Sequence, residues 1–328
     1  MKRRTFIAGI AGAATWPVVV ARAQQWTLPV VALVNARSED AGERLAEAFR
    51  KGLDETGHLE GRNVTVEYHW LSGQFDGLPA LMADLVRRRV ALIAAPISES
   101  VAIAAKAATS TIPIVFGVGQ DPVKLGLVAS LARPAGNATG INYFNQEILS
   151  KRLELLHQIV PKAISVAVLL NPANGTSSDT QLRDVQAAAY TIGLQIHVLK
   201  ANTSREIDAA FAALERERPD ALFVANSGFF TSRGVQIVNL AARERIPAAY
   251  SSREIVAVGG LMSYGTDIED TLRQIGVYAG RILKGAKPAD LPVVQATKFE
   301  FIINMQSARL LGLNVPPEVL AIADKVIE

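Results

Sequence analysis

The sequence predicts an α/β protein with two lobes, each a parallel sheet covered by helices on both faces. Short apolar runs alternate with amphipathic segments along the chain, which is the pattern of repeated β-α units. This pattern restarts after Asn142, and 328 residues are enough for two domains of ordinary size. A basic and then apolar N-terminus has the form of an export signal. Together these features predict a two-lobed, exported protein with a ligand cleft between its sheets.

The first half reads as four strands, each followed by a helix. Continuous Val/Ile/Ala runs are typical of strands buried on both faces of a parallel sheet. After the fourth run, Asp121-Pro122 has the form of an N-cap followed by proline at the first helical position. Residues 140–144, after a second break at 134–137, are expected to cross to the other lobe. The strands are expected at 29–34, 64–70, 90–95 and 112–116, and the helices at 41–56, 78–88, 98–108 and 123–131.

The second half repeats this order, and we expect a return crossing at 259–265. A long helix at 267–283 follows, ended by Gly285 and Pro288. The predicted division is 26–142 plus 265–297 for one lobe and 143–264 plus 298–328 for the other. The remaining strands are expected at 164–170, 195–199, 220–224, 247–250 and 299–304, and the helices at 148–160, 179–192, 205–217, 232–245 and 307–311.

The N-terminus accounts for the basic character of the chain. Lys2, Arg3 and Arg4 precede an apolar stretch, and Ala21-Arg22-Ala23 fits a small-x-small cleavage site. Without residues 1–23 the formal charge falls from +3 to −1, so net charge does not predict a nucleic-acid partner. Arg3-Arg4 also resembles a twin-arginine signal, and the choice between that route and general secretion stays open. We expect a periplasmic protein, acting as a monomer.

Catalytic and metal-binding motifs do not emerge from the sequence. The chain has no cysteine, and its four histidines are scattered without ligand spacing. Asn226-Ser227-Gly228 lacks the first glycine of a nucleophile elbow. Gly117-Val118-Gly119 follows a strand, but Pro122 stands where a dinucleotide fingerprint needs its third glycine. We therefore expect no enzyme activity and no cofactor.

Polar residues at strand ends predict a solute site, because ligands of α/β sheets bind at the carboxyl ends of strands. Ser98 and Ser100 open a helix directly after a strand, where free N–H groups can hold a carboxylate. An ordinary N-cap explains Ser98 equally well. Asp121 and Glu254 could pair with an ammonium group, although Asp121 could also cap its own helix. Aromatic rings could sandwich an apolar ligand body, and asparagines could supply amide hydrogen bonds. The complete candidate set is Asn35, Ser98, Ser100, Gln120, Asp121, Tyr143, Asn171, Asn174, Asn226, Tyr250, Glu254 and Tyr264.

Several segments carry a resemblance to a known family. They are Ala105–Thr109, Ile112–Phe116, Asp121–Val128, Lys151–Leu156, Gln181–Ala189, Gly259–Gly265, Ile282–Gly285 and Lys298–Glu300, beside the export segment ending Ala21–Gln25. Together they closely resemble the ABC-transporter substrate-binding family that includes tryptophan- and tyrosine-binding members. The resemblance covers essentially the whole chain.

This resemblance implies a type I periplasmic-binding-protein fold, with two Rossmann-like lobes joined by hinge crossings. It also implies capture of a small solute, delivery to a membrane permease, and no catalysis by this subunit. Ser98 and Ser100 stand at the loop that holds the carboxylate in aromatic-amino-acid binders of the family. The loop Pro96-Ile97-Ser98-Glu99 differs from the Gly/Thr-rich version of many members, and Glu99 would place a negative charge near a bound carboxylate.

Other functions stay open at this level. The same lobes could present a closed state to a sensor kinase or chemoreceptor. An exported hydrolase would need a nucleophile–base–orienter set, which the sequence does not offer. A sugar-binding regulator core fits the fold alone, but no DNA-binding segment precedes the first strand.

Overall fold

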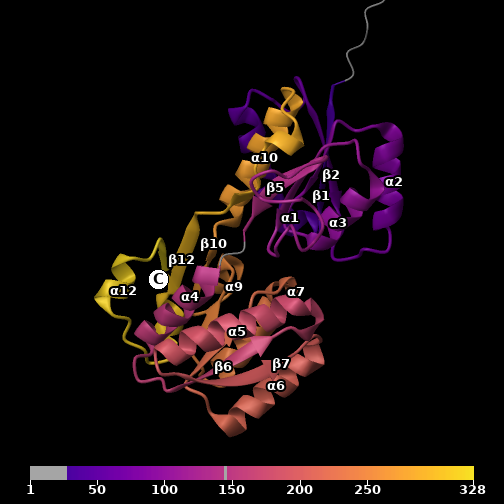
Figure 1. Ribbon diagram of the computed structural model, residues 1–328. Coiled ribbons are helices and arrows are strands. Elements are labelled where there is room, and N and C mark those ends of the chain that lie inside the picture. Colours follow the sequence, from indigo (N-terminus) through magenta and orange to yellow (C-terminus); the bar gives the residue numbers. More distant parts are fainter. Residues whose placement is uncertain (1–27, 144–145) are drawn as a thin grey trace, which may run out of the picture.

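The computed structural model describes residues 28–143 and 146–328, and the predicted export signal lies outside them. Two separate sheets form two lobes (Figure 1). The first sheet has six strands in the order β11-β5-β4-β3-β1-β2, all paired in parallel. Its strands are β1 (Val30–Asn35), β2 (Thr65–Trp70), β3 (Leu92–Ala95), β4 (Ile114–Val118), β5 (Ala138–Asn142) and β11 (Val294–Gln295).

Four helices cover this sheet, and the sheet and these helices are called the first lobe. On one face lie α1 (Glu39–Glu55) and α10 (Ile268–Leu283), which bury Phe49, Leu53 and Ile275 against the strands. On the other face lie α2 (Leu78–Arg88) and α3 (Glu99–Ala108), with Met82 and Leu85 in the core. Strands buried on both faces explain why the predicted runs were continuously apolar.

The backbones of α1 and α10 approach closely at glycines. A Cβ built on Gly52 would lie 1.9 Å from the Arg273 carbonyl oxygen, and one on Gly276 would lie 2.2 Å from the Phe49 carbonyl oxygen. These atoms belong to the backbone, so they cannot rotate away. The helix pair therefore depends on the missing side chains at both positions.

The second sheet has seven strands in the order β13-β12-β10-β9-β8-β6-β7. Strand β12 runs antiparallel to β10, and β13 runs parallel to β12, so this edge opposes the direction of the other strands. The strands are β6 (Ser165–Leu170), β7 (Gln195–Lys200), β8 (Ala221–Val224), β9 (Ala248–Tyr250), β10 (Met262–Thr266), β12 (Phe299–Asn304) and β13 (Lys325–Ile327).

Helices cover both faces of the second sheet as well, and together they form the second lobe. One core contains Leu153 and Phe301, and the other contains Phe211 and Tyr250. On the first of these faces lie α4 (Gln146–Ile159), α5 (Thr176–Thr191), α11 (Met305–Leu310) and α12 (Pro317–Ala321). On the other lie α6 (Ser204–Glu217), α8 (Gly234–Arg243) and α9 (Arg253–Ala257), and the short α7 (Gly228–Ser232) precedes α8.

A buried arginine holds two strands of the second lobe together. Arg152 of α4 is 2% exposed and its guanidinium lies 5.1 Å from the Phe223 ring centroid. Its Nε donates to the Tyr264 carbonyl at 2.8 Å and its Nη1 to the Val224 carbonyl at 3.3 Å. Burial lowers the pKa of Arg152 to about 9, because desolvation disfavours the charged form.

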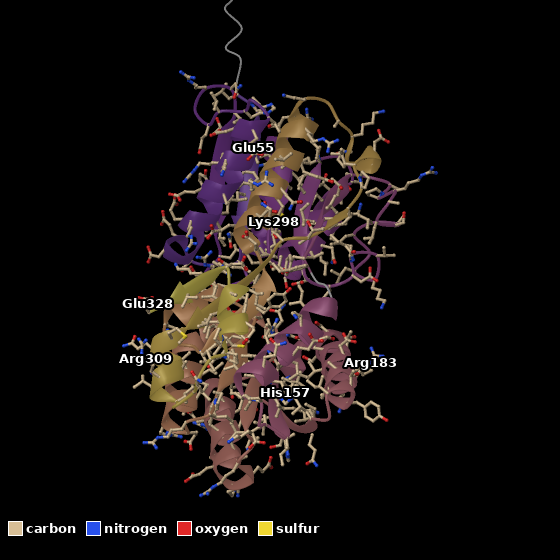
Figure 2. All side chains as sticks on the ribbon, turned by 90° about the vertical axis from the view of Figure 1, so that its left-hand side faces the viewer. Glu55, His157, Arg183, Lys298, Arg309 and Glu328 are labelled. Carbon is tan, nitrogen blue, oxygen red and sulfur yellow. The ribbon has the colours of Figure 1, made fainter. Side chains whose placement is uncertain are left out.

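The chain passes between the lobes three times, after β5, after β10 and after β11. Two hydrogen bonds fasten these crossings: Thr266 Oγ1 donates to the Tyr143 carbonyl at 2.8 Å, and Lys298 Nζ donates to Asp270 Oδ1 at 3.0 Å. Figure 2 shows Lys298 close to the junction of the lobes. Among the described residues, no helix combines the length and apolar character that crossing a bilayer requires.

Three local predictions were wrong. Residues 123–131 form turns rather than a helix, because Gly126 has a φ of +70° and ends the first turn. Gly140 belongs to strand β5, not to a crossing, and most of the expected crossing at 259–265 is strand β10. The predicted helix at 232–245, in contrast, is present as α8 (Gly234–Arg243), and the short α7 precedes it.

Candidate functional site

The carboxyl edges of the two sheets face each other. Arg37, two residues after β1, forms an ion pair with Glu254 in the first turn of α9, which follows β9. A second ion pair joins Arg253 to Glu269 of α10 at 3.7 Å. Since α10 belongs to the first lobe, both pairs connect one lobe to the other. The strand-end loops predicted to bind solute thus lie on the two surfaces that meet.

On the first lobe, Asn35 ends strand β1 and is 1% exposed. Its Oδ1 accepts the backbone N–H of Arg37 at 3.0 Å. Its Nδ2 is buried and has no hydrogen-bond partner among the described residues. An unpaired buried donor is costly, so this amide is available for an acceptor atom of a ligand.

The loop after β3 turns sharply into α3. Ile97 has a φ of +58°, which a β-branched residue rarely adopts. Ser98 is buried, and its Oγ accepts the Val101 N–H at 3.3 Å. The structure thus shows Ser98 as the N-cap of α3, whereas Ser100 is exposed on the first turn. Ser98 has this structural task whether or not it also contacts a ligand.

Glu99 and Tyr143 meet beside the loop after β4. Glu99 Oε1 accepts the Gly119 N–H at 2.9 Å. A Cβ built on Gly119 would lie 2.8 Å from Tyr143 Cε2 and 3.4 Å from Glu99 Oε1. Burial raises the pKa of Tyr143 well above its usual range, and the Glu99 carboxylate raises it further, against the opposing effects of Arg37 and the Gly119 backbone. Tyr143 therefore stays a neutral hydroxyl at physiological pH.

Gln120 and Asp121 continue this loop. The Gln120 carbonyl accepts from Asn142 Nδ2 at 2.7 Å, and the Gln120 side chain is half-buried. Asp121 is exposed, and its Oδ1 accepts the N–H groups of Val123 and Lys124 at 2.9 and 3.4 Å. The capping role weighed for Asp121 is therefore present, although it caps a turn rather than a helix.

On the second lobe, amide side chains tie the loops after β6 and β8 together. Asn171 Nδ2 donates to Ser227 Oγ at 3.0 Å, and Asn171 Oδ1 accepts the Ala173 N–H at 3.0 Å. Asn174 Nδ2 lies 3.4 Å from the Asn226 carbonyl oxygen. Gln181 bonds both backbone groups of Asn226, accepting its N–H at 2.7 Å and donating to its carbonyl at 3.1 Å. These bonds fix the shape of this edge.

Two predicted site residues do not reach the facing edges. Tyr250 is 1% exposed in the apolar core of the second lobe, and burial raises its pKa. Tyr264 lies inside β10, with ring centroids 6.1 Å from Phe299 and 6.3 Å from Phe301. Their positions near strand ends suggested ring contacts with a ligand. The core encloses Tyr250, which corrects that prediction, whereas Tyr264 is half-buried and packs against Phe299 and Phe301.

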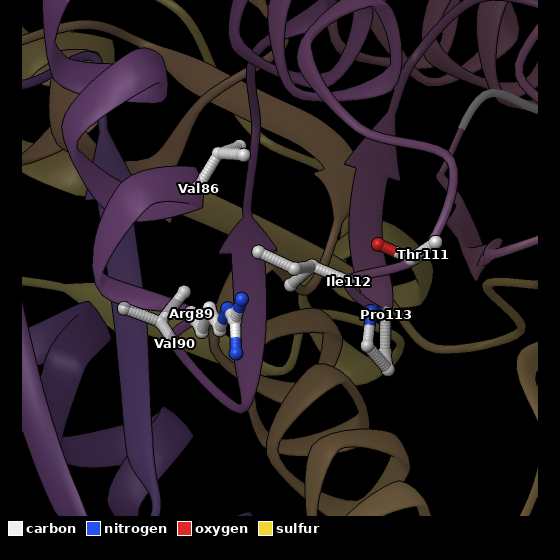
Figure 3. A pocket seen from close by; sticks show the side chains of 6 residues that line it. All are labelled: Val86, Arg89, Val90, Thr111, Ile112 and Pro113. Atoms are coloured by element: carbon white, nitrogen blue, oxygen red, sulfur yellow. The ribbon is translucent and has the colours of Figure 1, made fainter.

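Of the candidate residues, only Tyr264 lines either of two surface hollows. One of about 480 Å³ lies beside Tyr264, Lys151 and Lys298 on the face of the second sheet covered by α4. Another of about 390 Å³ is lined by residues that precede β3 and β4, at the amino ends of these strands (Figure 3). Its lining residues are Val86, Arg89, Val90, Thr111, Ile112 and Pro113.

Sequence reasoning missed some residues of the facing edges. Arg37 and Gln181 were not among the candidates, and Ser227 was considered only as a nucleophile. The signal for Arg37 and Ser227 was present, because both closely follow a strand end. Gln181 lies within α5, so nothing in its local pattern distinguishes it from a helix surface residue. No group of histidine, aspartate or glutamate side chains within the described ranges is arranged to hold a metal ion.

Comparison with known proteins identifies the family. The family model for ABC transporter substrate binding proteins matches residues 30–327. The chain belongs to this family. It is 28% identical over 271 residues to a tyrosine-binding protein of Clostridioides difficile (strain R20291), a match that covers 83% of this chain and 77% of the relative.

Solved structures of the family agree with this fold. A domain from Streptococcus pneumonia in complex with L-Trp has a TM-score of 0.82 and 25% identity, covering 92% of this chain and all of the other. A ligand-free, open substrate-binding protein with adhesive properties from Clostridium difficile has a TM-score of 0.72 and 25% identity, covering 92% and 99%. The predicted type I periplasmic-binding-protein fold is thus confirmed, as is the family resemblance.

Proposed function

We propose that this substrate-binding protein captures a small aromatic or amino-acid-like solute between its two lobes and delivers it to the permease of an ABC importer. The observation that carries the proposal is the meeting of two carboxyl strand edges at Arg37 and Glu254. The buried, unpaired Asn35 amide on one of these edges supports it further. The names of the tyrosine-binding relative and the L-Trp complex favour aromatic amino acids as the first solutes to test.

The proposed contact residues come from both lobes. Tyr250 and Tyr264 are left out because their rings lie in the core and on β10. Ser98 and Asn171 are kept because each stands at a strand end, although each also caps the segment that follows. The set is Asn35, Ser98, Ser100, Gln120, Asp121 and Tyr143 on the first lobe, and Asn171, Asn174, Asn226 and Glu254 on the second.

The proposed place of action is the periplasm. Residues 1–23 carry the features of a cleaved export signal, and delivery to a permease requires a protein on the outer side of the membrane. The mature chain would begin at Gln24 and act as a monomer without a cofactor. Catalysis has no part in the proposal, because the family is one of binding proteins.

Thermal unfolding of the mature chain tests the proposal. The protein is heated with L-amino acids, aromatic acids and small amides, each at several concentrations. A true ligand raises the melting temperature progressively, because it binds the folded state and not the unfolded chain. Uptake of that ligand by a strain lacking the protein tests delivery, and uptake should return when the gene is restored. A broad library without any shift would contradict the proposal.

A further inference from the structure

Glu99 is a carboxylate held in place at the meeting edges without a cationic partner. It is the first residue of α3 and half-buried, and its Oε1 accepts the Gly119 N–H at 2.9 Å. Among residues 28–143 and 146–328, no lysine, arginine or histidine forms an ion pair with it. A carboxylate has about four acceptor sites, so one that bonds a single backbone N–H can still accept a donor from outside the chain.

The charges around Glu99 leave an excess of negative charge. Arg37 is near enough to affect Tyr143, as Glu99 is, but its guanidinium is paired with Glu254 of the other lobe. Among the described residues, the Glu99 carboxylate thus has no ion-pair partner, whereas Arg37 already has one. Asp121, two residues beyond Gly119, adds a further carboxylate on this loop. A cationic group fits this balance, and a second carboxylate would increase the imbalance.

The position of Glu99 is more than that of an acid at a helix start. Glu39 holds the same first position in α1, which also follows a strand of this sheet, but its side chain is exposed to water. Glu99 instead reaches across to the loop after β4 and lies beside the Tyr143 ring. An aromatic ring next to a carboxylate is a favourable setting for an ammonium group, because the π-face attracts cations too.

We propose that Glu99, with Tyr143 beside it, binds the cationic group of the solute, so that the ligands are ammonium-bearing molecules and a carboxylate on the ligand is dispensable. This inference rests on the proposed function and names the solute class for the same site. The ligand ammonium would donate to the Glu99 carboxylate while the Gly119 N–H keeps Oε1 in position. The Asn35 Nδ2 then serves an acceptor atom elsewhere on the ligand, such as a carbonyl or hydroxyl oxygen.

A matched set of probes tests this assignment. The mature chain is titrated with tyrosine, with tyramine, which lacks the carboxylate, and with 3-(4-hydroxyphenyl)propionate, which lacks the ammonium group. Tryptophan and leucine, each with its corresponding amine and acid, extend the set to ligands with other side chains. Binding is measured by calorimetry and by the melting temperature. We expect the amines to bind and the acids to fail.

Substitution of Glu99 provides the second arm. Glu99→Gln keeps an oxygen for the Gly119 N–H but removes the charge, so the free protein should melt as the wild type does. We expect it to bind the amines about tenfold or more weakly, the scale of a lost charge-assisted bond. Glu39→Gln is the matched control, and its affinities should equal those of the wild type.

The outcomes separate this inference from the proposed function. Binding of the acids without the amines, or equal affinities in Glu99→Gln and the wild type, overturns the role of Glu99 and leaves solute capture standing. If none of the amines binds while neutral solutes of the wider library do, the role of Glu99 is likewise overturned and solute capture still stands. Failure of every probe and every library member overturns both proposals.

Discussion

Arg37 and Glu254 are 217 positions apart in the sequence and form an ion pair that joins the two lobes. Arg37 follows β1 of the first sheet, and Glu254 lies in the first turn of α9 after β9 of the second. Their side chains are 24% and 44% exposed. Because the pair exists only when the two edges are close, it is sensitive to the separation of the lobes rather than to the stability of either one.

We expect Glu254→Gln to increase the mean distance between the lobes while changing the free energy of unfolding by less than about 1 kcal/mol. The chain has no cysteine, so spin labels can be placed at Arg87→Cys and Tyr190→Cys, both on exposed helix surfaces. Pulsed electron paramagnetic resonance then gives the distance distribution. The charge-swapped pair Arg37→Glu with Glu254→Arg is the control and should restore it. An unchanged distance distribution in Glu254→Gln would show that the ion pair does not affect the separation of the lobes.

Gly52→Ala should destabilise the first lobe. Its new Cβ would meet the Arg273 carbonyl oxygen at 1.9 Å, so α1 and α10 would have to separate. Overpacking of this kind costs about 1–3 kcal/mol, measured as a lower urea midpoint. Gly77→Ala is the control, because no atom lies within 4 Å of its built Cβ, and its stability should change by less than about 0.5 kcal/mol. Equal midpoints for Gly52→Ala and wild type would contradict the tight helix contact.

Close packing on both faces of each sheet explains which strands could be predicted from the sequence. Runs such as 90–95 and 164–170 are continuously apolar because both faces of the sheet are covered. Gly140 and Gly265 instead resembled loop residues, yet they lie in β5 and β10. Their built Cβ atoms would lie 2.0 Å from the Phe116 carbonyl oxygen and 2.1 Å from that of Ser251. A glycine required by a neighbouring strand cannot be distinguished from a glycine required by a turn without that neighbour.

The sequence predicts which polar residues stand at strand ends, but it does not predict what their side chains contact. Asn35 is the last residue of β1, and Asn171 directly follows β6. The choice of partner depends on long-range placement, which no local pattern encodes. Ser98 bonds its own helix, Glu254 bonds an arginine of the other lobe, and the ring of Tyr250 is enclosed by the core.

Ser227→Ala should weaken the edge of the second lobe. It removes the acceptor of Asn171 Nδ2, which lies 3.0 Å from Ser227 Oγ in a buried position. A buried amide left without its partner costs about 1–3 kcal/mol, observable by urea unfolding. Ser232→Ala, an exposed serine bonded only to the Phe229 carbonyl within its own helix, serves as the control. If both variants unfolded at the same urea concentration, the Asn171–Ser227 hydrogen bond would not contribute to stability.

Arg152→Met should also reduce stability, although it removes a buried charge. The methionine fills much of the volume but leaves the carbonyls of Tyr264 and Val224 without the donors they have now. We expect a loss of about 1–3 kcal/mol. Arg183→Met, on the exposed side of α5 and bonded to Thr180, is the control for arginine removal as such. A more stable Arg152→Met protein would mean that desolvation of the guanidinium outweighs its bonds.

The environment of Asp270 predicts how the stability of the folded protein changes at acidic pH. Its side chain is only 6% exposed, and it accepts from Gln274 Nε2 at 2.6 Å, Lys298 Nζ at 3.0 Å and Arg273 Nη2 at 2.9 Å. Burial by itself would raise the pKa of Asp270, but the hydrogen bonds from Gln274, Lys298 and Arg273 outweigh it and lower the pKa below its usual range. The folded protein therefore holds this proton less tightly than the unfolded chain does.

The sign of the effect follows from that difference. A carboxyl group with a lowered folded pKa contributes stability above its unfolded pKa, near 4, and loses it as the pH falls through the folded value. Asp270→Asn should thus be about 1–3 kcal/mol less stable than the wild type at pH 7, and the gap should narrow below about pH 4. Urea unfolding between pH 7 and pH 2 measures both curves. Asp76→Asn, an exposed residue of the loop before α2, should follow the wild type throughout, and a gap for Asp270→Asn that stays constant with pH would exclude the ionised carboxylate as its source.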